Sequence, residues 1–247
     1  MFRIVGRKVN IKDYLRTIVD MKWSPQFVTL HNTAAPSLAQ RPNGFTEQHM
    51  RNLQGYYSGK GWPGGPHFFV DQNGIWAFNP IELPGVHSPS WNKKAIGVEM
   101  LGDYSYENFN TGDGAKVRDN AVLLIAELSK HFSFDPKSMK LHKEDKKTTH
   151  DCPGKNVSKE VFISLVEKEL NQETKIVIYR KGNGHDPAGV TSGLYKDGVN
   201  YGIVKNVETI TGTSCGKDGL QPIRVILGNK YTYSWDAPNM KLYCVEK

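Results

Sequence analysis

The sequence has few cysteines and no long apolar run, and both shortages limit what the protein can be. Of its 247 residues only three are cysteines, Cys152, Cys215 and Cys244. Three thiols cannot all pair, so we expect no disulfide framework and at least one thiol free for another task. Whether Cys215 and Cys244 pair stays open. No apolar run approaches the roughly 20 residues needed to cross a bilayer, which argues against membrane insertion.

Other familiar signals are also missing. Charged residues interrupt the apolar ones throughout residues 1–23, so this stretch lacks the continuous apolar core of a secretory signal. We therefore expect synthesis in the cytosol, with some other route carrying the protein out later. The sequence has no HExxH pattern, which weakens the hypothesis of an unrelated zinc peptidase. It contains no evident repeat.

The composition is that of an ordinary soluble globular protein with an excess of positive charge. Hydrophobic residues make up 38%, charged residues 23%, and the formal net charge is +7. Such a field favours polyanions, namely nucleic acid, anionic lipid or an acidic cell wall. The basic residues are dispersed and no nucleic-acid motif accompanies them, so we expect no nucleic-acid partner. General solubility is the competing explanation of the charge.

The chain divides by pattern into residues 1–172 and residues 173–247. In the first part, β-forming stretches alternate with helical periods. We expect strands over 26–33, 67–71, 75–78 and 95–101, and helices over 46–57, 117–132 and 158–170. The second part has no helical period and reads as a small β module. From residue 175 it holds 10 Lys and Arg against 6 Asp and Glu, more than half of the net charge.

The β module offers several strand candidates. The segment 223–235 is typical of a hairpin with a Gly-Asn turn, and the stretches 175–181, 199–205 and 241–247 are further candidates. An SH3-like barrel is one fold that these strands allow, and any other small β fold fits as well.

Three residues carry the side chains that zinc prefers. His31 ends a predicted strand, while His142 opens a polar loop that Cys152 closes. Imidazole and thiolate are preferred zinc ligands, and a catalytic zinc site uses three protein ligands with one position left for water. On ligand type alone, three unrelated polar residues remain the simpler interpretation.

Four sequence motifs, found in this order along the chain, favour the metal site over three unrelated polar residues. They are HNTAAP (31–36), GWPGGPHFFVDQNG (61–74), GVHSPSWNKKAIGVEMLG (85–102) and HKEDKKTTHDCPG (142–154). Together they resemble the zinc-dependent N-acetylmuramoyl-L-alanine amidases, the type 2 amidase family that includes many phage lysins and is related to the peptidoglycan recognition proteins. The resemblance covers about residues 20–170. It implies an α/β (α+β) fold in which helices flank a mixed central β-sheet, with Zn²⁺ in an edge groove held by His31, His142 and Cys152.

The resemblance also implies a reaction. Zinc-activated water would hydrolyse the amide between N-acetylmuramic acid and L-alanine of peptidoglycan. Glu99 matches the family's catalytic glutamate, and a carboxylate on an apolar strand suits a general base with a raised pKa. A salt-bridged structural glutamate is the alternative. His150 stands where many relatives place a lysine and would stabilise the oxyanion. An alternative is that His150, rather than His142, binds zinc.

Further matches suggest a substrate groove. His67 and His87 match family histidines, and Trp62, Trp91 and Asn92 are expected to line the groove because aromatic faces pack against sugar rings. For His67 a packing role under the sheet is an equal alternative, as is a buried structural role for each tryptophan. Pro66 occupies the place of a tyrosine in relatives, which shifts the catalytic burden to Glu99.

The layout predicts partners. The first part would act on the muramyl peptide of peptidoglycan, and the basic β module would hold an anionic cell-wall polymer. An amidase with a wall-binding tail is the usual plan of a phage endolysin that a holin releases to degrade the wall. A bacterial autolysin and a non-catalytic recognition protein are the alternatives. Recognition-only relatives typically lack the cysteine ligand, so the presence of Cys152 favours the enzyme.

Overall fold

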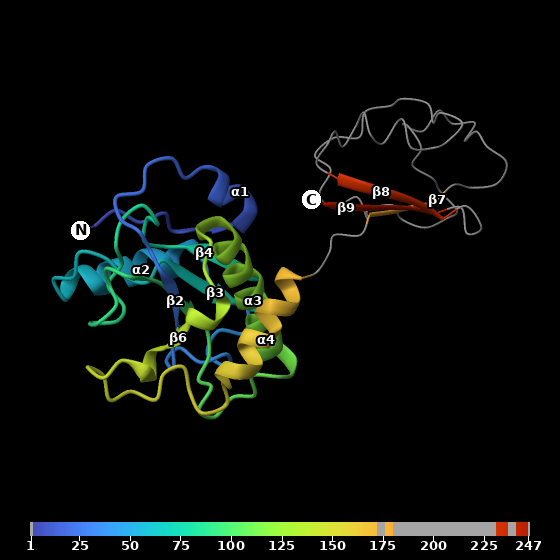
Figure 1. Cartoon of the computed structure of the whole chain (residues 1–247). Helices are drawn as coiled ribbons and strands as arrows, with labels where there is room; N and C mark the ends of the chain where they lie inside the picture. Colours follow the sequence, from blue (N-terminus) through green and yellow to red (C-terminus); the bar gives the residue numbers. More distant parts are fainter. Residues whose placement is uncertain (1, 172–175, 180–230, 237–240, 247) are drawn as a thin grey trace. The chain divides into compact units, whose positions relative to one another are not determined.

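The computed structural model describes residues 2–171, 176–179, 231–236 and 241–246 (Figure 1). The chain divides into two compact units, Met1–Asn171 and Gln172–Lys247. Within the described part of the chain, no helix combines the length and the apolar character that a membrane span requires.

A six-stranded mixed sheet forms the centre of the first unit, in the order β1-β4-β3-β5-β2-β6. Strands β3, β5, β2 and β6 run parallel to one another, whereas β4 and β1 pair antiparallel at the other edge. The strands span Arg7–Val9 (β1), Phe27–Asn32 (β2), Phe68–Asp71 (β3), Gly74–Ala77 (β4), Ala95–Met100 (β5) and Lys140–Leu141 (β6). The mixed central sheet expected from the sequence is thus confirmed.

Helices cover both faces of this sheet. They span Ile11–Arg16 (α1), Glu47–Gly59 (α2), Gly112–Phe132 (α3) and Lys159–Leu170 (α4), with short 3-10 turns at Pro136–Ser138 (η1) and His142–Glu144 (η2). Figure 1 shows α2 on the opposite side of the sheet from α3 and α4. The larger hydrophobic cluster joins α1, α3 and α4 to one face, and a smaller cluster around Met50 of α2 and Phe69 of β3 lies on the other.

Local chemistry explains where the helices begin. Helix α2 starts after Thr46, whose side chain accepts a hydrogen bond from the backbone of His49 while His49 accepts one in return. Helix α4 starts after Ser158, which caps Val161 in the same way. Helix α3 buries the apolar stripe that the sequence predicts, from Val117 to Leu128. On α4, Phe162 and Val166 face the core, whereas Val161 is 55% exposed.

The two strands predicted over 67–71 and 75–78 are present as β3 and β4, and they form a hairpin. Asp71 pairs with Gly74, so Gln72 and Asn73 form the loop and Gly74 already belongs to β4. Strands β1 and β6 and helix α1 have no counterpart among the predicted elements, because strands of two or three residues and a helix of six are too short for their periods to show.

The described part of the second unit is a three-stranded antiparallel sheet in the order β7-β9-β8. Its strands span Ile176–Tyr179 (β7), Tyr231–Asp236 (β8) and Lys241–Glu246 (β9). Strands β7 and β9 fall within the predicted stretches 175–181 and 241–247, and β8 overlaps 223–235 but ends one residue beyond it. Three parts of the prediction lie outside the described residues, namely the candidate strand 199–205, residues 223–230 of the predicted hairpin and Cys215. The prediction of an SH3-like barrel depends on those residues and stays a prediction.

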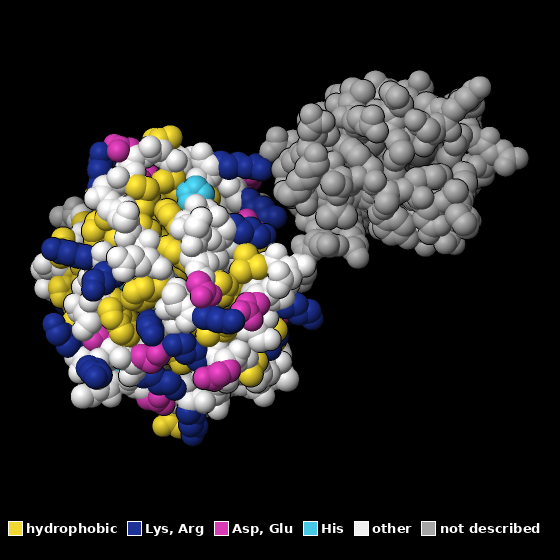
Figure 2. Space-filling model, viewed as in Figure 1, with side chains coloured by type: hydrophobic (Ala, Val, Ile, Leu, Met, Phe, Trp, Pro, Cys, Tyr) yellow, Lys and Arg dark blue, Asp and Glu magenta, His cyan; other side chains and the backbone are white. Residues whose placement is uncertain are grey.

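Charge is mixed over the surface of the first unit. On the face in Figure 2, Lys and Arg side chains alternate with Asp and Glu side chains. Several of these charges form exposed ion pairs within one helix, such as Arg51 with Glu47 and Lys116 with Asp113. Exposed pairs of this kind add little stability, typically below about 1 kcal/mol.

Candidate metal centre and its groove

One row of side chains across the sheet sets out the site. His31 of β2 is in register with Glu99 of β5, and Glu99 is in register with Phe69 of β3. Residues in register on neighbouring strands point to the same face. Since Phe69 packs in the cluster that contains Met50 of α2, all three side chains stand on the α2 face, close to the carboxyl ends of the parallel strands.

Strand β6 brings the second histidine beside the first. Leu30 of β2 pairs with Leu141 of β6, so the residues that follow them, His31 and His142, lie side by side with ring centroids 4.3 Å apart. The loop after His142 returns to the same place, because Lys143 donates its backbone N–H to the carbonyl of Cys152 at 2.7 Å. A two-residue edge strand thus positions one ligand candidate and closes the loop that carries another.

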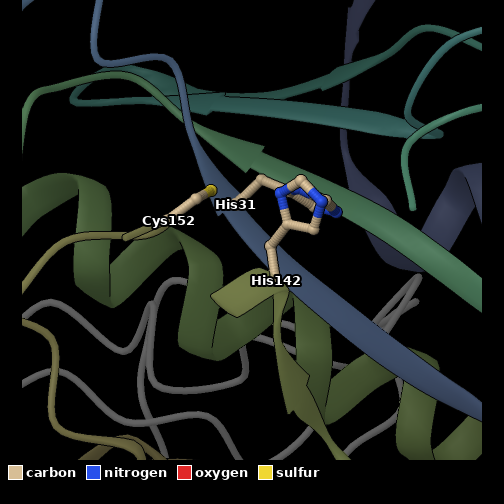
Figure 3. A group of neighbouring side chains, drawn as sticks. All are labelled: His31, His142 and Cys152. Carbon is tan, nitrogen blue, oxygen red and sulfur yellow. The ribbon is translucent and has the colours of Figure 1, made fainter. Parts of the chain in front are cut away.

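The three predicted ligands converge. His31, His142 and Cys152 each offer one donor atom, and these atoms all lie within 4.8 Å of one another. Figure 3 shows the side chains reaching the same point from β2 and from the two ends of the loop. His150 is not part of this group, so the geometry favours His142 over His150 as the second imidazole.

The chemistry of the group fits a soft divalent cation. The Nε2 atom of His142 is buried and lacks a hydrogen-bond partner among the described residues. Burial, followed by the neighbouring His87 and His142, lowers the pKa of His31, so its imidazole is neutral, which is the form that binds metals. Burial, followed by the charge of Glu99, raises the pKa of the Cys152 thiol. A cation at this point would reverse that effect, since a coordinating thiol is deprotonated outright.

Hydrogen bonds fix which nitrogen of His31 is free. His87 lies with Nε2 3.0 Å from the carbonyl of Ala95, which can only accept, so His87 donates through Nε2. Burial lowers the pKa of His87 to about 4, so its ring is neutral and Nδ1 must be an acceptor. The Nε2 atom of His31 lies 3.1 Å from that Nδ1 and therefore donates to it. This leaves Nδ1 of His31 with the lone pair that a metal needs.

Gly97 makes room for this arrangement. A Cβ atom at this position of β5 would lie 2.5 Å from Cγ of His87. The backbone N–H of Asn32 also donates to Sγ of Cys152, at 3.3 Å. An oriented histidine behind His31 and a donor to the sulfur are typical of the outer contacts that hold metal ligands in place.

Asp145 ties the ligand loop to the loop that carries His87. Its buried carboxylate accepts the hydroxyls of Ser88 and Ser90, each at 2.6 Å, and the backbone N–H groups of Ser90 and Lys147. Burial would raise the pKa of Asp145, but these hydrogen bonds outweigh it and hold the pKa below its usual range. The carboxylate is therefore ionised at neutral pH and clamps the two loops together.

Glu99 stands half-buried on the wall of the groove, beside His31. Burial raises its pKa to about 8, so near neutral pH the protonated and ionised forms are both available. A carboxyl group with such a pKa can exchange protons with a reacting group at neutral pH. The raised pKa expected from the sequence for this strand carboxylate is thus found, and no ion pair with Glu99 exists among the described residues.

The groove in front of these residues has a volume of about 1050 Å³. One stripe of α2 forms a wall, with His49, Asn52, Leu53, Tyr56 and Tyr57 at helical spacing. Of the predicted groove residues, Trp62, His87 and Asn92 line it, and so does His150, which was predicted to stabilise the oxyanion. Trp62 stacks on Tyr57 with ring centroids 5.5 Å apart and is 41% exposed. The side chain of Asn92 accepts the backbone N–H groups of His87 and Ser88 and so shapes the wall from behind.

Two predicted groove residues lie elsewhere. His67 is fully buried, accepts the N–H of Gly97 through Nδ1 and contacts the carbonyl of Leu83 through Nε2, and its ring stacks on Trp23. With both nitrogens occupied it cannot reach a substrate, so it has the packing role that was the alternative. Trp91 packs edge-on against Phe27 and is not among the residues lining the groove. The prediction of a substrate contact is corrected for both.

The sequence analysis missed the α2 wall. Tyr57 is the clearest example, because its ring lies over Gly65 and it lines the groove together with Pro66. Burial, followed by the charge of Glu99, raises the pKa of Tyr57, so its hydroxyl stays protonated. The signal was the recurrence of polar and aromatic residues at positions 49, 52, 56 and 57, one face of the predicted helix.

Comparisons with known proteins place the first part of the chain in one family. The protein-family model described as N-acetylmuramoyl-L-alanine amidase matches residues 21–155, more than half of the chain. The chain is 26% identical over 138 residues to the peptidoglycan-recognition protein SC2 of Drosophila simulans, which covers 55% of this chain and 71% of that protein. The same protein of Drosophila melanogaster matches to the same extent.

Three solved structures are similar to part of this chain. N-acetylmuramoyl-L-alanine amidase LysC from Clostridium intestinale URNW is 22% identical and covers 59% of this chain and 87% of its own, with a TM-score of 0.48. Drosophila PGRP-LB is 22% identical and covers 59% and 84%, with a TM-score of 0.47. The catalytic domain of XlyA is 25% identical and covers 58% and 87%, with a TM-score of 0.46.

Proposed function

The chain belongs to the N-acetylmuramoyl-L-alanine amidase family, and we propose that its first unit hydrolyses the amide between N-acetylmuramic acid and L-alanine of peptidoglycan. The single observation that carries the proposal is the convergence of His31, His142 and Cys152 beside Glu99 in an open groove. A recognition protein needs the groove, but it has no need of three metal-binding side chains next to an acid with a raised pKa.

The metal that fits these residues is Zn²⁺, held by His31, His142 and Cys152. Two neutral imidazoles and one thiolate leave the ion a net positive charge, which lets it polarise a carbonyl and acidify water. The chain prepares the site in advance, since His87 orients His31 and the backbone of Asn32 holds the sulfur.

Glu99 would move the proton. Its carboxylate faces the groove in register with His31, so it can accept the proton of the attacking water and return it to the nitrogen that leaves as the amine of L-alanine. A pKa of about 8 suits both directions, because the acid and base forms are both populated near neutral pH. His150, exposed at the rim of the groove, is proposed to stabilise the negative charge that develops on the carbonyl oxygen.

The remaining roles extend this proposal to the whole chain. We place the muramyl sugar against Trp62 and Asn92, which line the groove, and assign the second unit to an anionic cell-wall polymer on the basis of its positive charge. The layout supports a phage endolysin that acts on the wall after release by a holin. A bacterial autolysin would use the same site.

A test on purified peptidoglycan separates the possible bonds. Mass spectrometry of the digest should find free lactyl groups on the glycan and free amines on L-alanine, without new reducing sugars. Cys152→Ala should lose bound zinc and activity together. New reducing ends would mean a glycosidase, and activity that persists in the metal-free variant would refute the ligand assignment.

The second candidate is a peptidoglycan-binding protein without catalysis, favoured by the names of the curated relatives. It predicts that the zinc-loaded protein sediments with peptidoglycan and releases no new ends. Both candidates predict binding to peptidoglycan, so binding measurements cannot separate them. Only the digest can, because the enzyme releases new ends and the binding protein does not.

A further inference from the structure

The groove wall next to α2 contains a cation that forms no ion pair among the described residues. Arg41 lines the groove, and among the described residues its guanidinium makes one hydrogen bond, from Nη1 to the carbonyl of Gln40 at 3.0 Å. Its Nε atom is buried and has no hydrogen-bond partner, and no described residue forms an ion pair with it. A buried donor left unpaired is energetically unfavourable, so a conformation that keeps one calls for a ligand.

The backbone of Arg41 is held in place. The side-chain amide of Gln72 donates to the carbonyls of Arg41 and Pro42, at 3.0 and 2.9 Å, and Gly44 donates its N–H to the carbonyl of Arg41 at 2.9 Å. The guanidinium therefore projects from a fixed point, which lowers the entropic cost of binding.

His49, on the first turns of α2, adds a second donor. The backbone N–H of Thr46 donates to its Nδ1 at 3.2 Å, so Nδ1 carries no proton. Desolvation, followed by the charge of Arg41, lowers the pKa of His49, which keeps the ring neutral. A neutral ring with an accepting Nδ1 carries its proton on Nε2. His49 thus offers the groove an N–H group.

Asn52, one turn further, adds a third donor. Arg51 donates to Oε1 of Gln48 through Nε and Nη2, so Gln48 must donate through its amide nitrogen. That nitrogen donates to Oδ1 of Asn52 at 2.8 Å, which fixes the orientation of the Asn52 amide. The NH₂ group of Asn52 has no hydrogen bond within the described chain and is free to donate.

We propose that Arg41, His49 and Asn52 form a subsite for a carboxylate of the peptide stem. The three line one groove and present only donors, and a planar guanidinium matches a carboxylate in two parallel hydrogen bonds. This inference rests on the proposed amidase function and adds to it a preference for stems whose carboxylates are free. The subsite is continuous with the reaction centre, since Phe45 contacts both His49 and Phe69, and Phe69 is in register with Glu99.

Three soluble probes test the subsite. They are N-acetylmuramoyl-L-Ala-D-Glu-L-Lys and two analogues, one amidated at the α-carboxyl of D-Glu and one at the C-terminus. For the zinc-loaded full chain, one of the two amidations should lower kcat/KM by about tenfold or more, and this identifies the carboxylate. Arg41→Gln should lower kcat/KM for the parent probe to the level of the sensitive amidated analogue. For that analogue, kcat/KM of Arg41→Gln should stay within about twofold of the wild-type value.

Arg118→Gln is the matched control, because Arg118 lies on α3, does not line the groove and pairs with Asp119. It should behave as the wild type with all three probes. Equal turnover of the three probes by the wild type would overturn the subsite. An equal loss of kcat/KM on all three probes in Arg41→Gln would also overturn it. That result would mean that Arg41 only stabilises the loop around it, where the side-chain oxygen of Gln72 also lacks a hydrogen-bond partner among the described residues.

Binding to Glu99→Gln by calorimetry keeps the two proposals apart. If no probe is cleaved by the wild type, the amidase function fails, while the subsite is still judged by whether one amidation weakens binding by about tenfold and whether Arg41→Gln removes the difference. If all probes bind Glu99→Gln alike, the subsite is refuted whatever the activity is.

Discussion

The two faces of the central sheet use neighbouring residues of the same strands for different purposes. Leu30 and Val98 point to the α3 side and are fully buried in the larger core, whereas the next residues, His31 and Glu99, point to the groove. The same step separates Leu141 from His142. Alternation along a strand thus puts a residue for stability beside a residue for chemistry. Substitutions one position apart should therefore have different consequences.

The sharpest test of this comparison is Leu30→Ala against His31→Ala. Loss of a fully buried leucine should lower the free energy of unfolding by about 2–5 kcal/mol and leave the zinc ligands in place. Loss of the histidine should reduce activity by about a thousandfold or more and remove zinc, with a smaller effect on the metal-free fold. Chemical denaturation in chelator, zinc content and peptidoglycan turnover measure the three effects. Equal loss of stability in both variants would mean that the faces are not separate.

Glu99→Gln should lower activity by about a hundredfold to ten-thousandfold with zinc retained, since it removes the proton acceptor and keeps the shape. Activity of the wild type should depend on pH near neutrality, and the residual activity of the variant should lose that dependence. Retained activity would assign Glu99 to the structure rather than to the reaction.

The same variant has an opposite effect on the metal-free protein. The folded-state pKa of Glu99, about 8, lies above its ordinary value, so the folded state holds the proton more tightly than the unfolded state. Stability should therefore fall as pH rises from about 4.5 to 8. Glu99→Gln should match the wild type near pH 4.5 and exceed it at pH 8 by on the order of 2 kcal/mol, less than the full pKa shift implies because the side chain is partly exposed to solvent. Denaturation in chelator at both values measures this, and a constant difference would contradict it.

His87 and His67 also differ in role, one serving the metal centre and the other the packing, and we expect effects of intermediate size. His87→Ala should weaken zinc binding by about 10–100-fold, because His31 loses the acceptor that fixes its tautomer. His67→Ala should lower stability and change zinc affinity much less, since His67 contacts Gly97 and Leu83. Competition with a chelator gives the affinity and thermal unfolding gives the stability. If His87→Ala binds zinc as tightly as the wild type, the proposed role of His87 is refuted.

The smallest effects concern the tryptophans. Trp62→Ala should raise KM several-fold and hardly change stability, because Trp62 is 41% exposed on the groove wall. Trp91→Ala should leave KM unchanged and lower the free energy of unfolding by about 1–2 kcal/mol, since its ring packs on Phe27. Steady-state kinetics on soluble muropeptides and denaturation curves distinguish the two. A raised KM in Trp91→Ala would restore it to the groove.

Part of this was readable from the sequence because it depends on local chemistry. Capping by Thr46 and Ser158 and the apolar period of α3 involve residues close together in the chain. The candidate ligands His31, His142 and Cys152 were suggested by donor type and by matching motifs, and the structure brings them within reach of one ion.

The rest depends on tertiary packing. His67 and His87 are both histidines beside an apolar strand, and only the fold decides that one is enclosed while the other reaches His31. The donors Arg41, His49 and Asn52 are ordinary polar residues until α2 is placed along the groove. Strand β6 has two residues and no pattern of its own, yet it puts His142 beside His31. Hydrogen-bond chains between distant segments leave no periodic trace in a sequence.

Zinc K-edge X-ray absorption on the purified full chain tests the metal centre most directly. One ion should be bound per chain, with one sulfur neighbour at about 2.3 Å and two imidazole nitrogens at about 2.0–2.1 Å. Cys152→Ser should remove the sulfur contribution. A protein that binds no zinc, or a sulfur signal that survives this substitution, would contradict the assignment of the three side chains to a single ion.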